Sequence, residues 1–90
     1  MKKYIITVVG KDSVGIIARV CTYLSENHAN ILDIAQTIVS GYFNMMMIVD
    51  PEKCEKSIEA MADDLDRIGE EIGVRIHLQH EDIFNMMHRI

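Results

Sequence analysis

The sequence changes its hydrophobic period within a single short loop near the N-terminus. Residues 4–9 are rich in β-branched side chains, which is typical of a strand. Five apolar residues then recur at helical spacing: Ile16, Ile17, Val20, Cys21 and Leu24. The loop at residues 10–15 therefore joins a strand directly to the N-terminus of a helix. Unpaired N–H groups and the positive end of the helix dipole at such a junction favour a bound carboxylate.

Two glycines in this loop are expected to serve its backbone geometry. We expect Gly10 to adopt a turn that other residues resist, and Gly15 to let a ligand approach the first helical turn without meeting a Cβ. The alternative is that both residues only shape the loop, because glycine-containing turns before helices are common.

The first helix is predicted to span residues 14–27. Asp12 or Ser13 is the expected N-cap, since short polar side chains accept hydrogen bonds from the first N–H groups of a helix. No glycine stands at the C-terminal end, so either Asn27 or His28 is expected to adopt the left-handed conformation there.

Two further β-rich runs, residues 30–39 and 42–49, flank a Ser-Gly dipeptide and predict a hairpin. In the later run, alternation directs four side chains toward the helices: Phe43, Met45, Met47 and Val49. Met46 and Ile48 are then left on the open side of the sheet. In the earlier run, either of two sets can face the helices: Ile34, Gln36 and Ile38, or Ala35, Thr37 and Val39.

The second helix is expected to begin at Asp50-Pro51, an N-cap followed by the residue type that suits the first helical position. Its apolar stripe comprises Cys54, Ile58, Met61, Leu65, Ile68 and Ile72. Gly73 is the expected stop, and residues 74–80 alternate as a half-buried strand. Residues 81–90 have a helical pattern but are too few to be stable alone, so we expect this tail helix to pack on its own domain or on a partner copy.

The order of these elements is strand, helix, strand, strand, helix, strand. With right-handed crossovers, this order predicts an α+β, ferredoxin-like βαββαβ sandwich: a four-stranded antiparallel sheet with both main helices on one face. We assign residues 1–80 to this domain and residues 81–90 to the C-terminal tail helix.

Composition narrows the classes of partner. A formal net charge of -5 disfavours nucleic acid, because phosphate backbones require a basic face. No apolar run approaches the ~20 residues of a membrane span, and no signal-peptide core is visible, so we expect a cytoplasmic protein without a membrane partner. A hydrophobic content of 49% in 90 residues should leave apolar surface for a second copy, which predicts a homodimer. Cys21 and Cys54 are expected to be reduced residues in or near the core.

Spacing alone assembles no catalytic site. His77 and His80 lie three apart in a predicted strand and so point to opposite faces, and the other two histidines are elsewhere in the sequence. We therefore expect no enzyme activity, no metal and no cofactor. Three other functions of this fold lack their key residues, namely a phosphate-binding arginine in the first loop, a Cys-x-x-Cys pair, and exposed strand aromatics on a basic sheet.

Over residues 3–80 the chain resembles the ACT domain, a small-molecule sensing module of amino-acid metabolism. Three features carry the resemblance: Val-Val-Gly-Lys-Asp-Ser-Val-Gly-Ile at residues 8–16, an Asn-Ile pair fifteen residues after Gly15, and the strand at residues 43–49 after a hairpin turn. The opening is most similar to stand-alone bacterial and archaeal ACT proteins and to the ACT domains of the glycine-cleavage-system transcriptional repressor. That similarity implies regulation without direct DNA contact.

The resemblance implies a ligand site between two copies, as in the serine-sensing ACT domain of phosphoglycerate dehydrogenase. Its ligand-holding positions, in the first loop and at the start of the second strand, correspond to Asp12 and Asn30. The complete candidate set is Gly10, Lys11, Asp12, Gly15, Ile16 and Asn30. Gly10 stands where the family has a histidine, and Asp12 where it has an asparagine. A carboxylate repels a ligand carboxylate, so serine specificity does not transfer.

These observations lead to the hypothesis of a non-enzymatic homodimer that binds an amino acid at the loop–helix junction and passes its occupancy to a regulated protein partner. The alternative is a ligand-free dimerisation or adaptor module. The dimer is expected to use the open sheet face, a strand edge or the tail helix.

Overall fold

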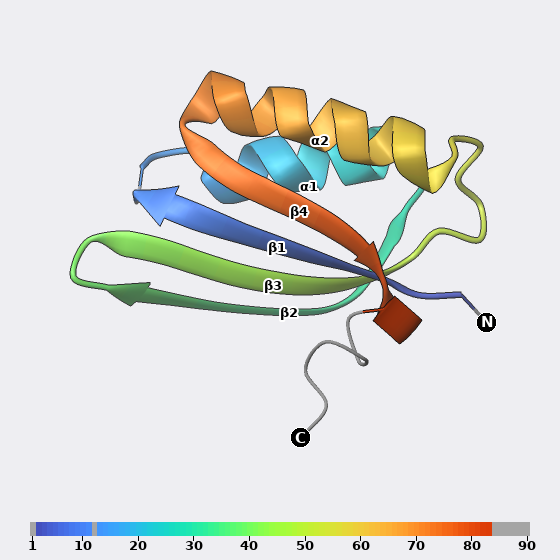
Figure 1. The fold of residues 1–90 in the computed structure, drawn as a ribbon, viewed down its shortest axis with the longest axis horizontal. Helices are drawn as coiled ribbons and strands as arrows, with labels where there is room; N and C mark the ends of the chain where they lie inside the picture. Colours follow the sequence, from blue (N-terminus) through green and yellow to red (C-terminus); the bar gives the residue numbers. More distant parts are fainter. Residues whose placement is uncertain (1, 12, 84–90) are drawn as a thin grey trace.

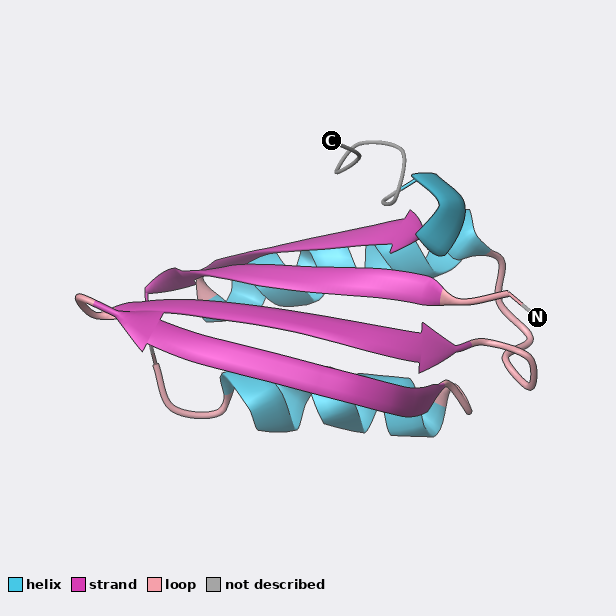
Figure 2. Ribbon diagram, turned by 90° about the horizontal axis from the view of Figure 1, so that it is seen from below, coloured by secondary structure: helices cyan, strands magenta, loops and turns pink. Residues whose placement is uncertain are grey.

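The computed structural model describes residues 2–11 and 13–83 of the chain. Its elements are β1 (Tyr4–Lys11), α1 (Ile16–Glu26), β2 (Asn30–Val39), β3 (Tyr42–Asp50), α2 (Ile58–Ile72) and β4 (Val74–His80). The strands form one antiparallel sheet in the order β2-β3-β1-β4, and both helices cover the same face of it (Figure 1 and Figure 2). The predicted ferredoxin-like α+β fold is confirmed.

The core lies between the sheet and the helical layer. Its largest fully buried side chains come from strands and helices alike: Ile6, Val8, Ile16, Val20, Leu24, Met47, Val49, Met61 and Leu65. Burial of such side chains contributes about 1.5–3 kcal/mol each relative to exposure, so this single layer of contacts holds both helices on the sheet.

The β2–β3 hairpin and the orientation of β3 match the sequence-based expectation. Ser40 and Gly41 have φ angles of 51° and 81°, and positive φ at both central residues is the mark of the type I′ turn that joins twisted strands. The side chains predicted to face the helices are buried, whereas Met46 on the opposite face is 40% exposed.

The orientation of β2, which the sequence left undecided, is set by an irregularity in its pairing. A register shift between Ile31 and Asp33 places Ile34 opposite Met47 and Ile38 opposite Phe43, on the helical side of the sheet. Thr37 and its alternating neighbours consequently lie on the open face. Ile34 and Ile38 nevertheless remain 42% and 58% exposed, because the helices do not cover this edge of the sheet.

The start of α1 differs from the prediction. The N-cap is Gly15, in the left-handed conformation, and the helix begins at Ile16 rather than at Val14. The prediction of Asp12 or Ser13 as N-cap was wrong, since the chain stays non-helical two residues longer. At the other end, His28 has a φ of 60°, which confirms one of the two residues expected in the left-handed conformation.

The start of α2 was also predicted wrongly. Asp50 is the last residue of β3, and its carboxylate accepts a hydrogen bond from the Glu52 N–H at 2.9 Å, which makes a turn rather than a helix cap. The N-cap is Ser57, whose hydroxyl accepts from the Ala60 N–H at 3.2 Å. Cys54 therefore lies in the preceding loop and not on the helical stripe. The predicted stop at Gly73 is confirmed, with a φ of 77°.

The predicted C-terminal helix is described only at its beginning. Residues 81–83 are helical, and the Glu81 N–H donates to the Lys3 carbonyl at 2.9 Å, which fixes this turn beside the start of β1. The rest of the predicted tail helix, residues 84–90, lies outside the described residues. Within the described ranges, no helix has the length and apolar character needed to cross a bilayer.

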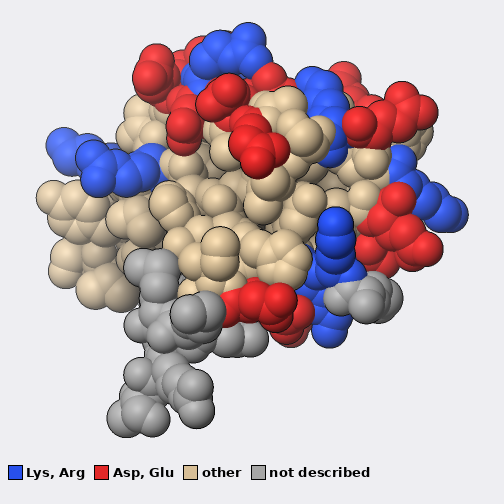
Figure 3. Space-filling model, turned by 45° about the vertical axis from the view of Figure 1, so that its right-hand side comes forward, with Lys and Arg blue, Asp and Glu red and all other residues tan. Residues whose placement is uncertain are grey.

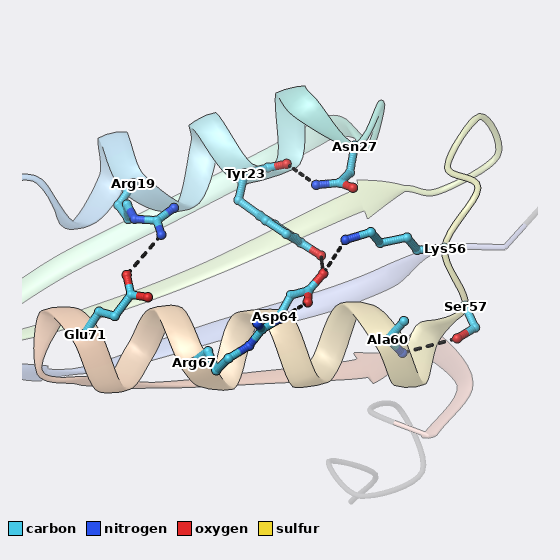
Figure 4. Close-up of polar contacts among 9 residues, drawn as sticks. All are labelled: Arg19, Tyr23, Asn27, Lys56, Ser57, Ala60, Asp64, Arg67 and Glu71. Atoms are coloured by element: carbon cyan, nitrogen blue, oxygen red, sulfur yellow. Dashed lines mark hydrogen bonds and ion pairs between the residues drawn. The ribbon is translucent and has the colours of Figure 1, made fainter.

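Polar contacts join the two helices on their outer side (Figure 4). The Tyr23 hydroxyl of α1 and the Lys56 ammonium both donate to Asp64 of α2 at 2.6 Å, and Arg67 pairs with the same carboxylate. Arg19 and Glu71 form a second bridge at 3.0 Å. We refer to Tyr23, Lys56, Asp64 and Arg67 as the Asp64 cluster. It ties α1, α2 and the loop before α2 at one point.

Candidate functional site

A small cleft of about 260 Å³ lies where α1 begins. Its walls come from the loop before α1, the first turn of α1 and the β2–β3 hairpin, and they comprise Ser13, Gly15, Ile16, Ile17, Ala18, Gln36, Ile38 and Phe43. Ligand pockets commonly measure ~300–1,000 Å³, so this cleft suits a small metabolite rather than a nucleotide or a large cofactor.

The first turn of α1 lines this cleft and begins without a capping side chain among the described residues. Gly15 has a φ of 92°, and a Cβ built on it meets no described atom within 4 Å. Among the described residues, no side chain caps the helix and its first turn holds no acid. The first helical hydrogen bond runs from the Arg19 N–H to the Gly15 carbonyl at 2.9 Å, so the N–H groups ahead of it have no intrahelical partner. This arrangement can bind a carboxylate.

The other predicted loop residues have different roles from those expected. Gly10 is a regular member of β1, paired with Phe43 and Val74, and does not have positive φ, so the predicted turn at this residue is wrong. Glycine is required there because an added Cβ would lie 2.8 Å from Val74 Cγ1. Lys11 is the exposed last residue of β1, and Ile16 has its side chain in the core, 2% exposed. Asp12 lies outside the described residues.

Asn30 does not lie at the same cleft within one chain. It pairs with Asp50 at the first end of β2, beside the C-terminus of α1, where both residues line a separate hollow of about 590 Å³. Gln36 and Ile38, which line the cleft at Gly15, lie toward the other end of the strand. At ~3.3 Å per residue, Asn30 and that cleft are separated by roughly 20–30 Å.

Sequence reasoning missed the apolar wall of the cleft. Ile17 follows Ile16 in the helical pattern and could have been included on that basis. Gln36 and Ile38 could not be placed, because either face of β2 fitted the sequence and only the register shift near Asp33 selects the one that turns toward α1. The positions of Gln36 and Ile38 therefore follow from the pairing of β2 with β3 and not from the local sequence.

Many charged side chains of both signs lie over the helical layer (Figure 3). In the Asp64 cluster, hydrogen bonds from Lys56 and Tyr23 lower the pKa of Asp64 to about 2, with the Arg67 charge acting in the same direction. Burial, followed by the hydrogen bond to Asp64, raises the pKa of the Tyr23 hydroxyl. The contacts of this carboxylate with Tyr23 and Lys56 join α1, α2 and the loop between β3 and α2.

Groups suited to metal binding or redox chemistry are not gathered in the described part of the chain. No set of three or more His, Cys, Asp or Glu side chains in residues 2–11 and 13–83 could hold a metal ion. Cys21 and Cys54 are free and half-buried, and burial raises the pKa of the Cys21 thiol. The Cys54 thiol donates a weak hydrogen bond to Met61 Sδ at 3.4 Å, at the edge of the core.

Comparison with known proteins identifies the family of this chain. The sequence signature of the ACT domain matches residues 2–79, which is most of the chain. The chain belongs to the ACT domain family. ACT domains are regulatory ligand-binding modules, and the open helix terminus described above lies in the loop that carried the resemblance at the sequence level.

Two similar proteins cover essentially the same length as this ACT protein. It is 62% identical over 90 residues to a UPF0237 protein of Bifidobacterium longum, with all of both chains covered. The structure of an ACT domain protein from Streptococcus pneumoniae superimposes with a TM-score of 0.82 at 37% identity, over 92% of this chain and 93% of that one.

A third comparison concerns the fold alone. The structure of a putative glycine cleavage system transcriptional repressor superimposes with a TM-score of 0.74 at 21% identity, over 88% of this chain and 45% of the other. This chain therefore corresponds in fold to about half of that protein, which confirms the predicted structural similarity to its ACT domains.

Proposed function

We propose that this ACT protein is a non-enzymatic regulator that binds a free amino acid at the cleft beside Gly15. The observation that carries the proposal is the N-terminus of α1, which no described side chain caps and whose first turn lines a cleft of about 260 Å³ next to a glycine without described neighbours within 4 Å. The ligand carboxylate would accept hydrogen bonds from the first N–H groups of α1, with the helix dipole favouring its negative charge.

A homodimer through β2 is the assembly that this site requires. β2 is an edge strand of ten residues, and an exposed edge of this length invites pairing with another strand. Antiparallel pairing of two β2 strands about a twofold axis brings the start of one strand beside the end of the other. Asn30 of the second copy would then approach the cleft that lies far from Asn30 within one chain. Of the three surfaces predicted for dimerisation, we therefore propose the strand edge, because pairing there would bring Asn30 of the second copy toward the cleft.

Amino-acid binding is tested by calorimetry and thermal shift with each of the twenty amino acids at millimolar concentration. We expect one chemically related group to bind and raise the melting temperature, because a ligand that binds only the folded state stabilises it. Twenty null results would contradict the proposal and favour the ligand-free dimerisation or adaptor module.

The position of the site is tested with Gly15→Ala. Its added Cβ would stand over the first turn, so we expect binding to weaken at least tenfold. Positive φ makes this substitution costly for stability as well, and Gly73→Ala is the matched control because Gly73 also has positive φ, has no neighbour within 4 Å and does not line the cleft. Equal loss of binding in both variants would mean that the effect is one of stability and not of the site.

The two-copy site is tested by mixing two defective chains, one with Gly15→Ala and the other with Asn30→Ala. In a mixed dimer, one site receives both defects and the other receives neither, so we expect half of the sites in the mixed dimers to recover full affinity. If each site lies within one chain, every site in the mixture keeps one defect. No recovery, with mixed dimers shown to form, would contradict the two-copy arrangement.

A further inference from the structure

The proposed carboxylate contact is common to all amino acids, so it does not say which of them binds. The residues that line the cleft bear on the ligand side chain. Among the described lining residues, the side chains are uncharged, and Ile17, Ile38 and Phe43 give the wall its apolar character. Ile38 is 58% exposed although it lies on the helical side of the sheet. A ligand seated here would cover this apolar surface.

We propose that the cleft selects amino acids with uncharged aliphatic side chains, and that Ile38 is the residue that determines this selectivity. The inference rests on the proposed function, since it assumes that an amino acid binds at Gly15. A charged side chain entering this cleft would lose water without gaining a counter-ion from the described wall, whereas an aliphatic one gains by leaving water. The modest volume of about 260 Å³ favours a compact side chain.

Ile38 is placed to act on the ligand side chain and not on its backbone groups. It projects from β2 toward the first turn of α1, together with Gln36, while the N–H groups that would hold the carboxylate belong to α1 itself. Changing residue 38 should therefore change which side chain is preferred, and leave the requirement for a free carboxylate as it is.

The first test is an affinity series with glycine, alanine, valine and isoleucine on the unaltered protein. Each further buried methylene should strengthen binding about fourfold, since a buried CH₂ contributes about 0.8 kcal/mol. Leucine and aspartate form a second pair of similar branching, and we expect leucine to bind at least tenfold more tightly. A flat series, or preference for aspartate or lysine, would overturn this inference while leaving amino-acid binding established.

The second test changes the preference with Ile38→Asp. A carboxylate in the wall should weaken isoleucine at least tenfold and strengthen lysine or arginine, because it supplies the missing counter-ion. Val39→Asp is the matched control: it adds the same charge to the neighbouring residue, which lies on the opposite face of β2. An identical change of preference in both variants would show a general electrostatic effect and overturn the role of Ile38. Failure of every amino acid to bind the unaltered protein would instead contradict the proposed function.

Discussion

The two edge strands of the sheet, β4 and β2, differ in length, in exposure and in how closely a helix covers them. At one edge, β4 is short, carries Arg75 and His77 on its exposed face, and is packed closely by α2. At the other, β2 has ten residues that are almost all exposed, including Leu32, Ile34, Ile38 and Val39, and α1 covers little of it.

Glycine explains how closely the β4 edge is packed. A Cβ on Gly69 of α2 would lie 2.6 Å from the Val74 carbonyl oxygen, and one on Gly10 would lie 2.8 Å from Val74 Cγ1. The helix and the central strand therefore both approach β4 at positions without a side chain. Charged residues and a covering helix protect an edge from pairing, and β2 has neither protection to this degree. The comparison indicates that β4 is integrated into the folded monomer, and the exposure of β2 supports the proposal that this strand pairs with a second copy.

The largest expected effect is on stability, through the packing of α2 against β4. Gly69→Ala forces the new Cβ against the Val74 backbone, which cannot rotate away as a flexible side chain can, so we expect the free energy of unfolding to fall by about 3 kcal/mol. Urea unfolding monitored by circular dichroism measures this change. Glu70→Ala, at the next and exposed residue of α2, is the control and should stay within about 0.5 kcal/mol. Equal stabilities of the two variants would mean that α2 does not hold β4 in this way.

The next largest effect is expected on dimerisation through β2. Leu32→Lys combined with Ile34→Lys removes apolar surface from β2 and brings like charges together across a twofold axis, so dimerisation should weaken about 100-fold, or about 2.8 kcal/mol. Both side chains are already substantially exposed, so the monomer should remain folded. Sedimentation equilibrium measures the dissociation constant. His77→Lys places a charge on β4 for comparison, and a similar weakening by that change would remove the distinction between the edges.

The smallest expected effect concerns the Asp64 cluster, which joins α1 to α2. Folding lowers the pKa of Asp64 from 3.8 to about 2, so its contribution to stability is present above pH ~4 and is lost as the pH falls toward 2. Tyr23→Phe removes one hydrogen bond to this carboxylate and should cost about 1 kcal/mol at neutral pH.

Urea unfolding at neutral pH measures the cost of Tyr23→Phe, and acid unfolding measures the contribution of Asp64. Asp64→Asn should lack the component of the stability loss that occurs between pH ~4 and ~2, while the unaltered protein shows it. Superimposable acid-unfolding profiles would mean that the Asp64 cluster does not contribute to holding α1 and α2 together.

The sequence by itself determined the elements whose signals are local. Alternation of side chains placed β3 correctly, the Ser-Gly dipeptide at residues 40 and 41 placed the hairpin, and Gly73 placed the end of α2. These features depend on neighbours in the chain, so their residues carry the information. Local signals failed where two were in competition: Asp50-Pro51 has the features of a helix cap, but pairing of Asp50 with Asn30 extends β3 and moves the cap to Ser57.

Only the tertiary structure decided how the candidate site is assembled. The register shift in β2 turned Gln36 and Ile38 toward α1, and two faces with equal apolar content gave the sequence no means of choosing between them. Gly10 cannot carry a Cβ because Val74 of β4 lies against it, and this contact exists only in the folded sheet. The separation of Asn30 from the cleft likewise follows from the direction of β2 within the sheet. Each of these depends on contacts between residues distant in sequence, and such contacts leave no periodic signal along the chain.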